Sequence, residues 1–230
     1  MLLHFVMAFI GGYFGLYAIV ARNDLFGSAQ TSNLIYLVQD ILVVIRIGAL
    51  VLYSTAVALS VWLPKHTAVN NKILSILIDG GAAILLGFLP KHMNPVLGLY
   101  PIFFAMAFQW CSFKGIGGYN SATVFSTNNL RQFVSAVTLF ADEKKQEHLQ
   151  KLKFYGGTLL SFHVGVGAAC VAWQFFDVTS IWLCFLALPA AFGLAVYEHS
   201  LTIEPEITME VVEPEAIKNA INKNAVQQIG

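Results

Sequence analysis

Apolar stretches of about 20 residues recur along the whole chain. A helix rises about 1.5 Å per residue and the hydrocarbon core of a bilayer is about 30 Å thick, so a stretch of this length can cross a membrane. Of the 230 residues, 57% are hydrophobic and 11% are charged, whereas soluble domains carry about 25% charged residues. The chain is therefore predicted to be an all-α, multi-pass membrane protein with the lipid bilayer as a partner.

Six of these stretches are predicted to be transmembrane helices. Proline, glycine and charged residues separate them at intervals that fit single crossings. The apolar run from Leu34 to Leu63 would be about 45 Å long as one helix, so we divide it into a short helix and a span. The predicted spans are residues 2–21, 41–63, 73–89, 96–113, 152–175 and 179–196, and the short helices are residues 32–39 and 129–140.

Two polar segments of similar composition interrupt this apolar chain. GSAQTSNL (27–34) follows the first span, and GGYNSATVFSTNNL (117–130) follows the fourth. Glycine, hydroxyl-bearing residues and asparagine favour turns and helix caps, so we expect a short helix to begin at each segment. The order of span, polar turn, short helix, span and span occurs twice, which predicts an internal repeat.

The two copies of the repeat correspond to residues 1–92 and 93–197. Three spans in each copy invert the second copy in the membrane relative to the first, an arrangement common in transporters. The side of the membrane that holds the tail has ten of the 13 Lys and Arg, and the other side has Arg22, Arg46 and Lys91. Because cytoplasmic loops carry more positive charge, both termini are predicted to be cytoplasmic. Residues 198–230 form an acidic tail whose composition favours disorder.

The polar turns and their flanks resemble the YoaK family of bacterial inner-membrane proteins. The matching stretches are GGYFGLY (11–17), AQTSNL (29–34), FAMAFQWCSF (104–113) and GGYNSATVFSTNNL (117–130). The resemblance covers all six predicted spans and implies a place in the bacterial inner membrane, but the function of that family is unassigned. This chain departs from the family pattern at the acidic position of the first helix, which is Gly15, and at the glycines of the turns, which are Ser32 and Asn128.

The two polar turns are the predicted binding site for a solute. A helix that begins within the membrane has unpaired N–H groups and the positive end of its dipole at its start, and inverted copies can bring two such starts together. Such a site suits a small polar or anionic solute. The alternative is that the turn residues only satisfy backbone groups left open by helix breaks. The candidate residues are Thr31, Ser32 and Asn33 in the first turn, Thr127, Asn128 and Asn129 in the second, and Gln109 on the fourth span.

Asp79 and His163 are the candidates for proton coupling. Asp79 falls in the middle of the third predicted span, where an ionised side chain costs at least ~2.5 kcal/mol, and such residues are often functional. His163 falls in the fifth span and could relay protons. The alternatives are a neutral or paired Asp79 that holds two helices together, beside Gly80 and Gly81, and a hydrogen-bonded structural His163.

The sequence thus predicts a secondary transporter or channel-like carrier in which the repeats rock about the turns, and flux should be lost in Asn129→Ala. The alternative is a membrane scaffold or partner-binding subunit that uses its tail, and deletion of residues 202–230 would separate the two. Six spans are few for alternating access within one chain, so a homodimer is plausible. No enzyme or metal-binding motif is present, and there is no basic surface for nucleic acid, so we expect no catalytic residues, cofactor or metal.

Overall fold

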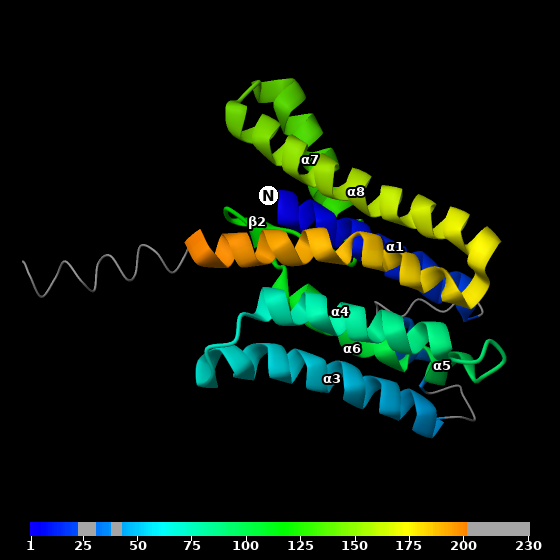
Figure 1. Ribbon diagram of the computed structural model, residues 1–230. Helices are drawn as coiled ribbons and strands as arrows, with labels where there is room; N and C mark the ends of the chain where they lie inside the picture. Colours follow the sequence, from blue (N-terminus) through cyan, green and yellow to red (C-terminus); the bar gives the residue numbers. More distant parts are fainter. Residues whose placement is uncertain (23–30, 38–42, 202–230) are drawn as a thin grey trace, which may run out of the picture. The chain divides into compact units, whose positions relative to one another are not determined.

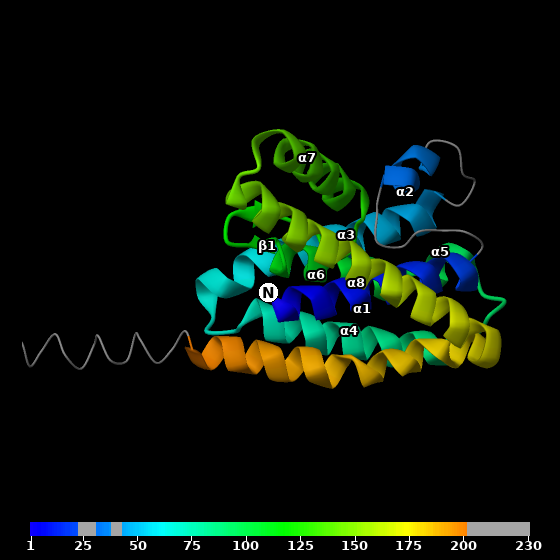
Figure 2. The ribbon, with the colours of Figure 1, turned by 90° about the horizontal axis from the view of Figure 1, so that it is seen from above.

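The computed structural model describes residues 1–22, 31–37 and 43–201, and these are almost entirely helical (Figure 1, Figure 2). They divide into a unit of residues 1–192 and a second unit that begins at Gly193 and is helical as far as residue 201. The elements of the first unit are α1 (Leu2–Ala21), α2 (Thr31–Tyr36), α3 (Val43–His66), α4 (Asn71–Phe88), α5 (Pro95–Gly98), α6 (Tyr100–Ser112), β1 (Gly115–Ile116), β2 (Tyr119–Asn120), α7 (Thr127–Glu143), α8 (Gln146–Phe176) and the 3₁₀ segment η1 (Asp177–Leu186).

Four helical stretches in the described part of the chain are long and apolar enough to cross a membrane. Three are α1, α3 and α4, and the fourth is the 56-residue run Gln146–Leu201, which contains α8 and η1. A straight helix of that length would measure about 84 Å, far more than a bilayer. Asp177, with φ of 50°, ends α8, and Figure 1 shows the chain turning back there. The protein is therefore an all-helical chain with the lengths and composition of a multi-pass membrane protein.

The helix boundaries follow local signals closely in the first half of the chain. α1, α3 and α4 lie within a few residues of the predicted spans 2–21, 41–63 and 73–89. Asn70 begins α4, because its side chain accepts hydrogen bonds from the N–H groups of Lys72 and Ile73 at 2.9 and 3.3 Å.

The second half differs from the prediction in two places. The stretch 96–113 is not one helix but α5 followed by α6, and Pro101 stands in the first turn of α6, where proline favours a helix start. At 13 residues, α6 is shorter than a typical span of about 20. The stretch 179–196 begins as the 3₁₀ segment η1 rather than as an α-helix.

α1 and α8 pack closely along their length because glycines face each other's backbone (Figure 2). A Cβ added at Gly12 would collide with the carbonyl oxygen of Phe162, and one added at Gly165 would collide with the carbonyl oxygen of Phe9. Small residues let two membrane helices approach until their backbones touch, which increases van der Waals contact. The glycines of the two helices thus set the distance between α1 and α8.

α6 is an inner helix that packs against both α3 and α4. Seven of its residues are buried, from Ile102 to Gln109. Ala107 and Phe108 form a buried cluster with Ala56 of α3. This packing places the end of α6, and the loop that follows it, next to α1.

Candidate functional site

A short hairpin and loop lead from α6 to the start of α7. β1 and β2 pair antiparallel through the two residues Gly117 and Gly118, whose φ values are 61° and 84°. Two central residues with positive φ form the turn that best matches the twist of a hairpin, and glycine adopts it without strain. The loop that follows, residues 121–126, is largely buried and ends at the first turn of α7.

Asn129 holds this loop in place from within the protein. Its side chain is 1% exposed. Its amide nitrogen donates to the carbonyl oxygens of Ala122 at 2.7 Å and Phe125 at 3.1 Å, and its oxygen accepts from the hydroxyl of Ser121 at 2.9 Å. The Ser121 hydroxyl lies 3.0 Å from Nε2 of His4 on α1. Asn129 therefore fixes the loop that leads into α7, and its side chain does not face an open cavity.

Gln109 connects the same loop to α1 through hydrogen bonds. Its Nε2 donates to the carbonyl oxygen of Met7 and to the hydroxyl of Thr123, both at 2.9 Å. The side chain is fully buried, and its Oε1 has no hydrogen-bond partner in the described part of the protein. Gln109 thus joins α6, α1 and the loop, which is the interhelical role that polar side chains often have in membranes.

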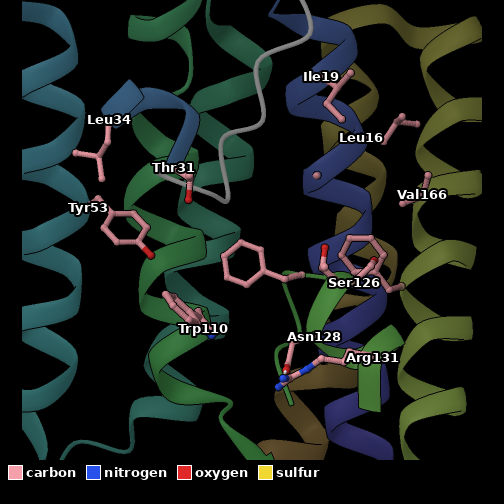
Figure 3. A pocket seen from close by; sticks show the side chains of 14 residues that line it. Leu16, Ile19, Thr31, Leu34, Tyr53, Trp110, Ser126, Asn128, Arg131 and Val166 are labelled. Carbon is pink, nitrogen blue, oxygen red and sulfur yellow. Dashed lines mark hydrogen bonds between the residues drawn. The ribbon is translucent and has the colours of Figure 1, made fainter. Parts of the chain in front are cut away.

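A cavity of about 880 Å³ lies beside these buried hydrogen bonds. Residues of α1, α2, α3, α6 and α8 line it, together with the start of α7 (Figure 3). Both polar segments reach it, since its wall includes Thr31 of α2 and Ser126, Thr127 and Asn128 at the start of α7. Gly15 of α1 also lines it.

The polar end of the cavity is formed by the first turn of α7. Ser126 precedes this helix without a side-chain cap hydrogen bond, and its buried hydroxyl oxygen has no partner among the described residues. Arg131 also lines the cavity and donates to Oδ1 of Asn128 at 3.2 Å, and Figure 3 shows the two side chains together. No carboxylate in the described residues pairs with Arg131. Uncapped N–H groups and a guanidinium here favour an anion.

The structure brings some of the predicted site residues together and separates others. Thr31, Thr127 and Asn128 line the cavity, whereas Gln109 and Asn129 lie behind its wall. Ser32 and Asn33 belong to the backbone of α2, but their side chains, like residues 27–30 of the first turn, lie outside the described residues.

The two candidates for proton coupling occupy different helices and neither lines the cavity. Asp79 on α4 is fully buried, and neither of its carboxylate oxygens has a hydrogen-bond partner in the described structure. His163 on α8 is exposed, and its Nδ1 bonds to the carbonyl oxygen of Leu159 in its own helix at 2.8 Å.

Arg131, Ser126 and Trp110 are cavity residues that the sequence reasoning did not select. From the sequence, Arg131 is one of the ten positive charges on the side of the membrane that holds the tail. Its spacing was nevertheless a signal, because it follows Asn128 by three residues and Thr127 by four, and such residues share one face of a helix.

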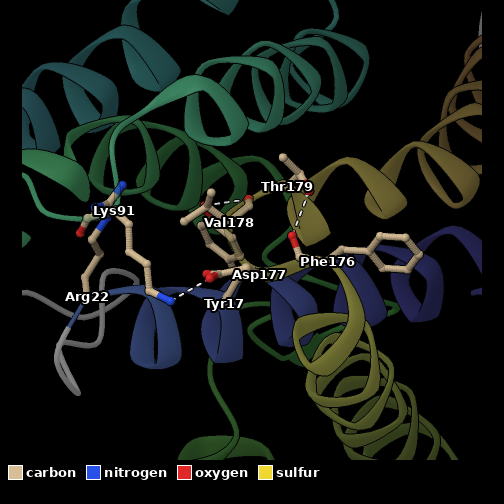
Figure 4. Close-up of polar contacts among 7 residues, drawn as sticks. All are labelled: Tyr17, Arg22, Lys91, Phe176, Asp177, Val178 and Thr179. Carbon is tan, nitrogen blue, oxygen red and sulfur yellow. Dashed lines mark hydrogen bonds and ion pairs between the residues drawn. The ribbon is translucent and has the colours of Figure 1, made fainter.

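A second polar cluster joins the end of α1 to the junction of α8 and η1 (Figure 4). Arg22 is buried and donates to the carbonyl oxygens of Pro90 at 2.9 Å and Lys91 at 3.2 Å. Lys91 pairs with Asp177 at 2.5 Å, and the Tyr17 hydroxyl donates to the carbonyl oxygen of Val178 at 3.1 Å. None of these residues lines the cavity. This cluster therefore has a structural role, in which it connects the ends of helices.

The described residues contain no group of three or more His, Cys, Asp or Glu side chains that could hold a metal ion. Neither a comparison with curated proteins nor one with solved structures gave a match. A family model described as a protein of unknown function, DUF1275, matches residues 3–194, which include all of the described helical residues except Leu2 and residues 195–201. This protein therefore belongs to the DUF1275 family.

Proposed function

We propose that this protein is a membrane carrier for a small polar or anionic solute, which binds in the cavity at the start of α7. The observation that carries the proposal is that both polar segments, 96 residues apart at Thr31 and Thr127, contribute to one cavity wall. Irregular backbone at membrane depth is tolerated where it is buried or lines a cavity. α2 has only six residues, so the dipole and N–H groups that attract a solute come from α7.

The contacts between helices support a pair of related three-span repeats, α1 to α4 and α6 to η1. The contact between α1 and α8 corresponds to the contact between α6 and α3. The contact between α1 and η1 likewise corresponds to the contact between α6 and α4. The contact between α2 and α3 corresponds to the contact between α7 and α8. The third spans of the two repeats, α4 and η1, pack against each other. Exchanging the two repeats converts each of these contacts into another one of the set or, for the contact between α4 and η1, into itself, as a two-fold relation requires. We assign the repeats opposite orientations in the membrane, which makes six spans with both termini in the cytoplasm of a bacterial cell.

The position of the cavity fits alternating access by two such repeats. Its walls come from the first span, short helix and second span of each repeat, and not from α4 or η1. In inverted-repeat transporters, substrate sites lie at the repeat interface and one repeat rocks against the other around the site. Rocking of the first repeat, α1 to α4, relative to the second, α6 to η1, would open the cavity to one side and then to the other.

Asp79 is our candidate for proton coupling. A fully buried carboxyl without a hydrogen-bond partner is costly when ionised, so release of its proton requires water to reach α4. The rocking movement would supply that access, because α4 packs against α6 of the other repeat. His163 bonds within its own helix and is exposed, which makes it the weaker candidate.

A thermal-shift screen tests the proposal on the purified full-length protein, with organic anions, amino acids, sugars and simple salts as probes. A ligand at 100 times its Kd stabilises the folded state by about 2.7 kcal/mol, which is measurable. We expect a shift in the wild type that is strongly reduced in Arg131→Gln. Lys153→Gln is the matched control, because Lys153 is exposed and lies outside the cavity.

Proteoliposome flux of the compound that shifts the melting temperature completes the test. A carrier loses flux in Arg131→Gln and keeps it when residues 202–230 are deleted. Retained binding without any flux would instead favour a receptor or scaffold. No shift with any probe would remove the cavity from the function.

A further inference from the structure

We propose that the solute is a monovalent carboxylic acid with an apolar, ring-bearing or branched body, its carboxylate at Arg131 and the first turn of α7 and its body against the aromatic wall. This inference rests on the proposed function, because it specifies the ligand of the same cavity. It goes further by excluding inorganic anions, sugars and amino acids as the preferred class.

The first argument is the separation of polar and apolar residues around the cavity. Apart from Thr31, the charged residues and those with short polar side chains come from the single stretch 126–131 at the start of α7. The rest of the wall is apolar or aromatic, and in Figure 3 Leu16, Ile19 and Val166 lie together at the end away from Asn128 and Arg131. A ligand that matches this wall is polar at one end only, which a sugar is not.

The second argument is charge. Among the described residues that line the cavity, Arg131 is the one with a formal charge and none is acidic. The N-terminus of α7 adds a partial positive charge of about half a unit. This positive charge of about one and a half units fully neutralises one carboxylate, whereas a dianion would keep about half a negative charge unneutralised in a largely apolar cavity. The ammonium group of an amino acid would face the guanidinium with no acid to receive it.

The third argument is the exposed aromatic surface in the wall. Trp110 is 40% exposed although its helix, α6, is an inner one. Its ring meets the Phe125 ring edge to face, with centroids 5.0 Å apart and an angle of 82°. Exposed apolar surface costs about 25 cal/mol per Å², and a rigid aromatic pair offers a flat face to a ring or a branched chain. The apolar body of the ligand would cover this surface.

The volume agrees with such a ligand. At about 880 Å³, the cavity lies within the range of about 300–1,000 Å³ typical of pockets for drug-sized ligands. Acetate or inorganic phosphate would fill a small part of it and leave the apolar wall in contact with water. The same chemistry also occurs in free fatty acids of the bilayer, so the test includes both sources.

Binding to the full-length protein in phosphatidylcholine nanodiscs tests this inference, because no detergent then competes for the apolar wall. The probes are phenylacetate, its neutral isostere phenylacetamide, acetate, inorganic phosphate and oleate. We expect phenylacetate to bind at least about tenfold more tightly than phenylacetamide, the ratio that one charge-assisted hydrogen bond provides. Acetate and phosphate should bind more weakly than phenylacetate. Tight oleate binding with weak phenylacetate binding would keep the carboxylate and the apolar body but replace the ring or branched chain by an unbranched one, with the bilayer as the source.

Substitutions in the cavity test which residues bind the carboxylate of the ligand and which bind its apolar body. Arg131→Gln should remove the preference for phenylacetate over phenylacetamide, and Arg131→Lys should restore part of it. Trp110→Ala should weaken phenylacetate by about tenfold and leave acetate unchanged. Arg131 and Trp110 are exposed, so both variants should fold, and gel filtration checks this.

Three outcomes would overturn the inference. Phosphate or acetate binding as tightly as phenylacetate would show that charge alone is recognised, and the proposed carrier site would stand. Equal binding of the amide would show that the carboxylate is not recognised. Binding of none of the probes, with transport of another compound by the wild type, would reject the acid class alone, whereas absence of any ligand or flux would also reject the proposed function.

Discussion

The Ser121 hydroxyl donates to Oδ1 of Asn129 across 2.9 Å, and both residues are buried without lining the cavity. A serine hydroxyl has a single proton, so once it is given to Asn129, the contact of 3.0 Å with His4 requires Nε2 of His4 to donate to Ser121. The chain of bonds therefore runs from α1 through the loop to α7. It explains why a residue predicted to touch the solute has a supporting position instead.

Asn129→Ala should destabilise the protein and reduce ligand binding only as a consequence of that. The change leaves the carbonyl oxygens of Ala122 and Phe125 without their donor, and each buried polar group left unsatisfied costs about 1–3 kcal/mol. Thermal unfolding measures the loss. Asn128→Ala is the comparison, because Asn128 lines the cavity and should lower affinity with little effect on the melting temperature. Equal melting temperatures for Asn129→Ala and wild type would contradict the supporting role.

Gly12→Ala and Gly165→Ala should both destabilise the contact between α1 and α8. Each added methyl group meets a carbonyl oxygen of the facing helix, and overpacking of this kind typically costs about 1–3 kcal/mol. Gly167→Ala is the matched control on α8, since a Cβ there meets nothing within 4 Å. The control should be neutral or stabilising by up to about 1 kcal/mol, because alanine is the better helix former. The three melting temperatures are the measurement. A control variant as unstable as the other two would argue against close packing of α1 and α8.

Asp79→Asn should leave stability almost unchanged. The side chain is fully buried without a hydrogen-bond partner, so we expect a neutral carboxyl group, and a carboxamide has nearly the same shape. If Asp79 were ionised and paired, the substitution would cost about 3–5 kcal/mol, as the loss of a buried partner does. Thermal unfolding distinguishes the two states, with the exposed Asp142→Asn as control. Flux across a pH gradient then tests coupling, which Asp79→Asn should abolish while equilibrium exchange continues.

Asp177→Gly should be more stable than Asp177→Ala. Both changes remove the ion pair with Lys91, which is half exposed and contributes at most about 1 kcal/mol. They differ in backbone strain, because Asp177 has φ of 50° and ψ of −132°, a conformation that costs residues other than glycine about 1–3 kcal/mol. Denaturant titration of the two variants gives the difference, and equal stability would mean that the α8–η1 turn does not require this conformation.

Much of the fold could be predicted because it depends on local features. The lengths of α1, α3 and α4 follow from the bilayer thickness and from nearby polar or capping residues such as Asn70. The start of the second short helix could be placed to within two residues, at Thr127 rather than Asn129, because hydroxyl and amide side chains favour such positions. Thr31 and Thr127 contribute to one cavity wall, and binding of a solute there stays a prediction.

The direction of each side chain was decided by packing between distant segments. From Phe154 to Phe176, α8 contains no Asp, Glu, Lys or Arg, so the sequence offers no charged face that separates His163, which is exposed, from its neighbour Phe162, which lines the cavity. Gln109 turns inward because it reaches Met7, 102 residues earlier in the chain. Local patterns therefore determined which residues form helices and how long those helices are. The tertiary fold determined which polar groups meet, because in a chain so uniformly apolar the contacts, and not the periodicity, select the face that each helix buries.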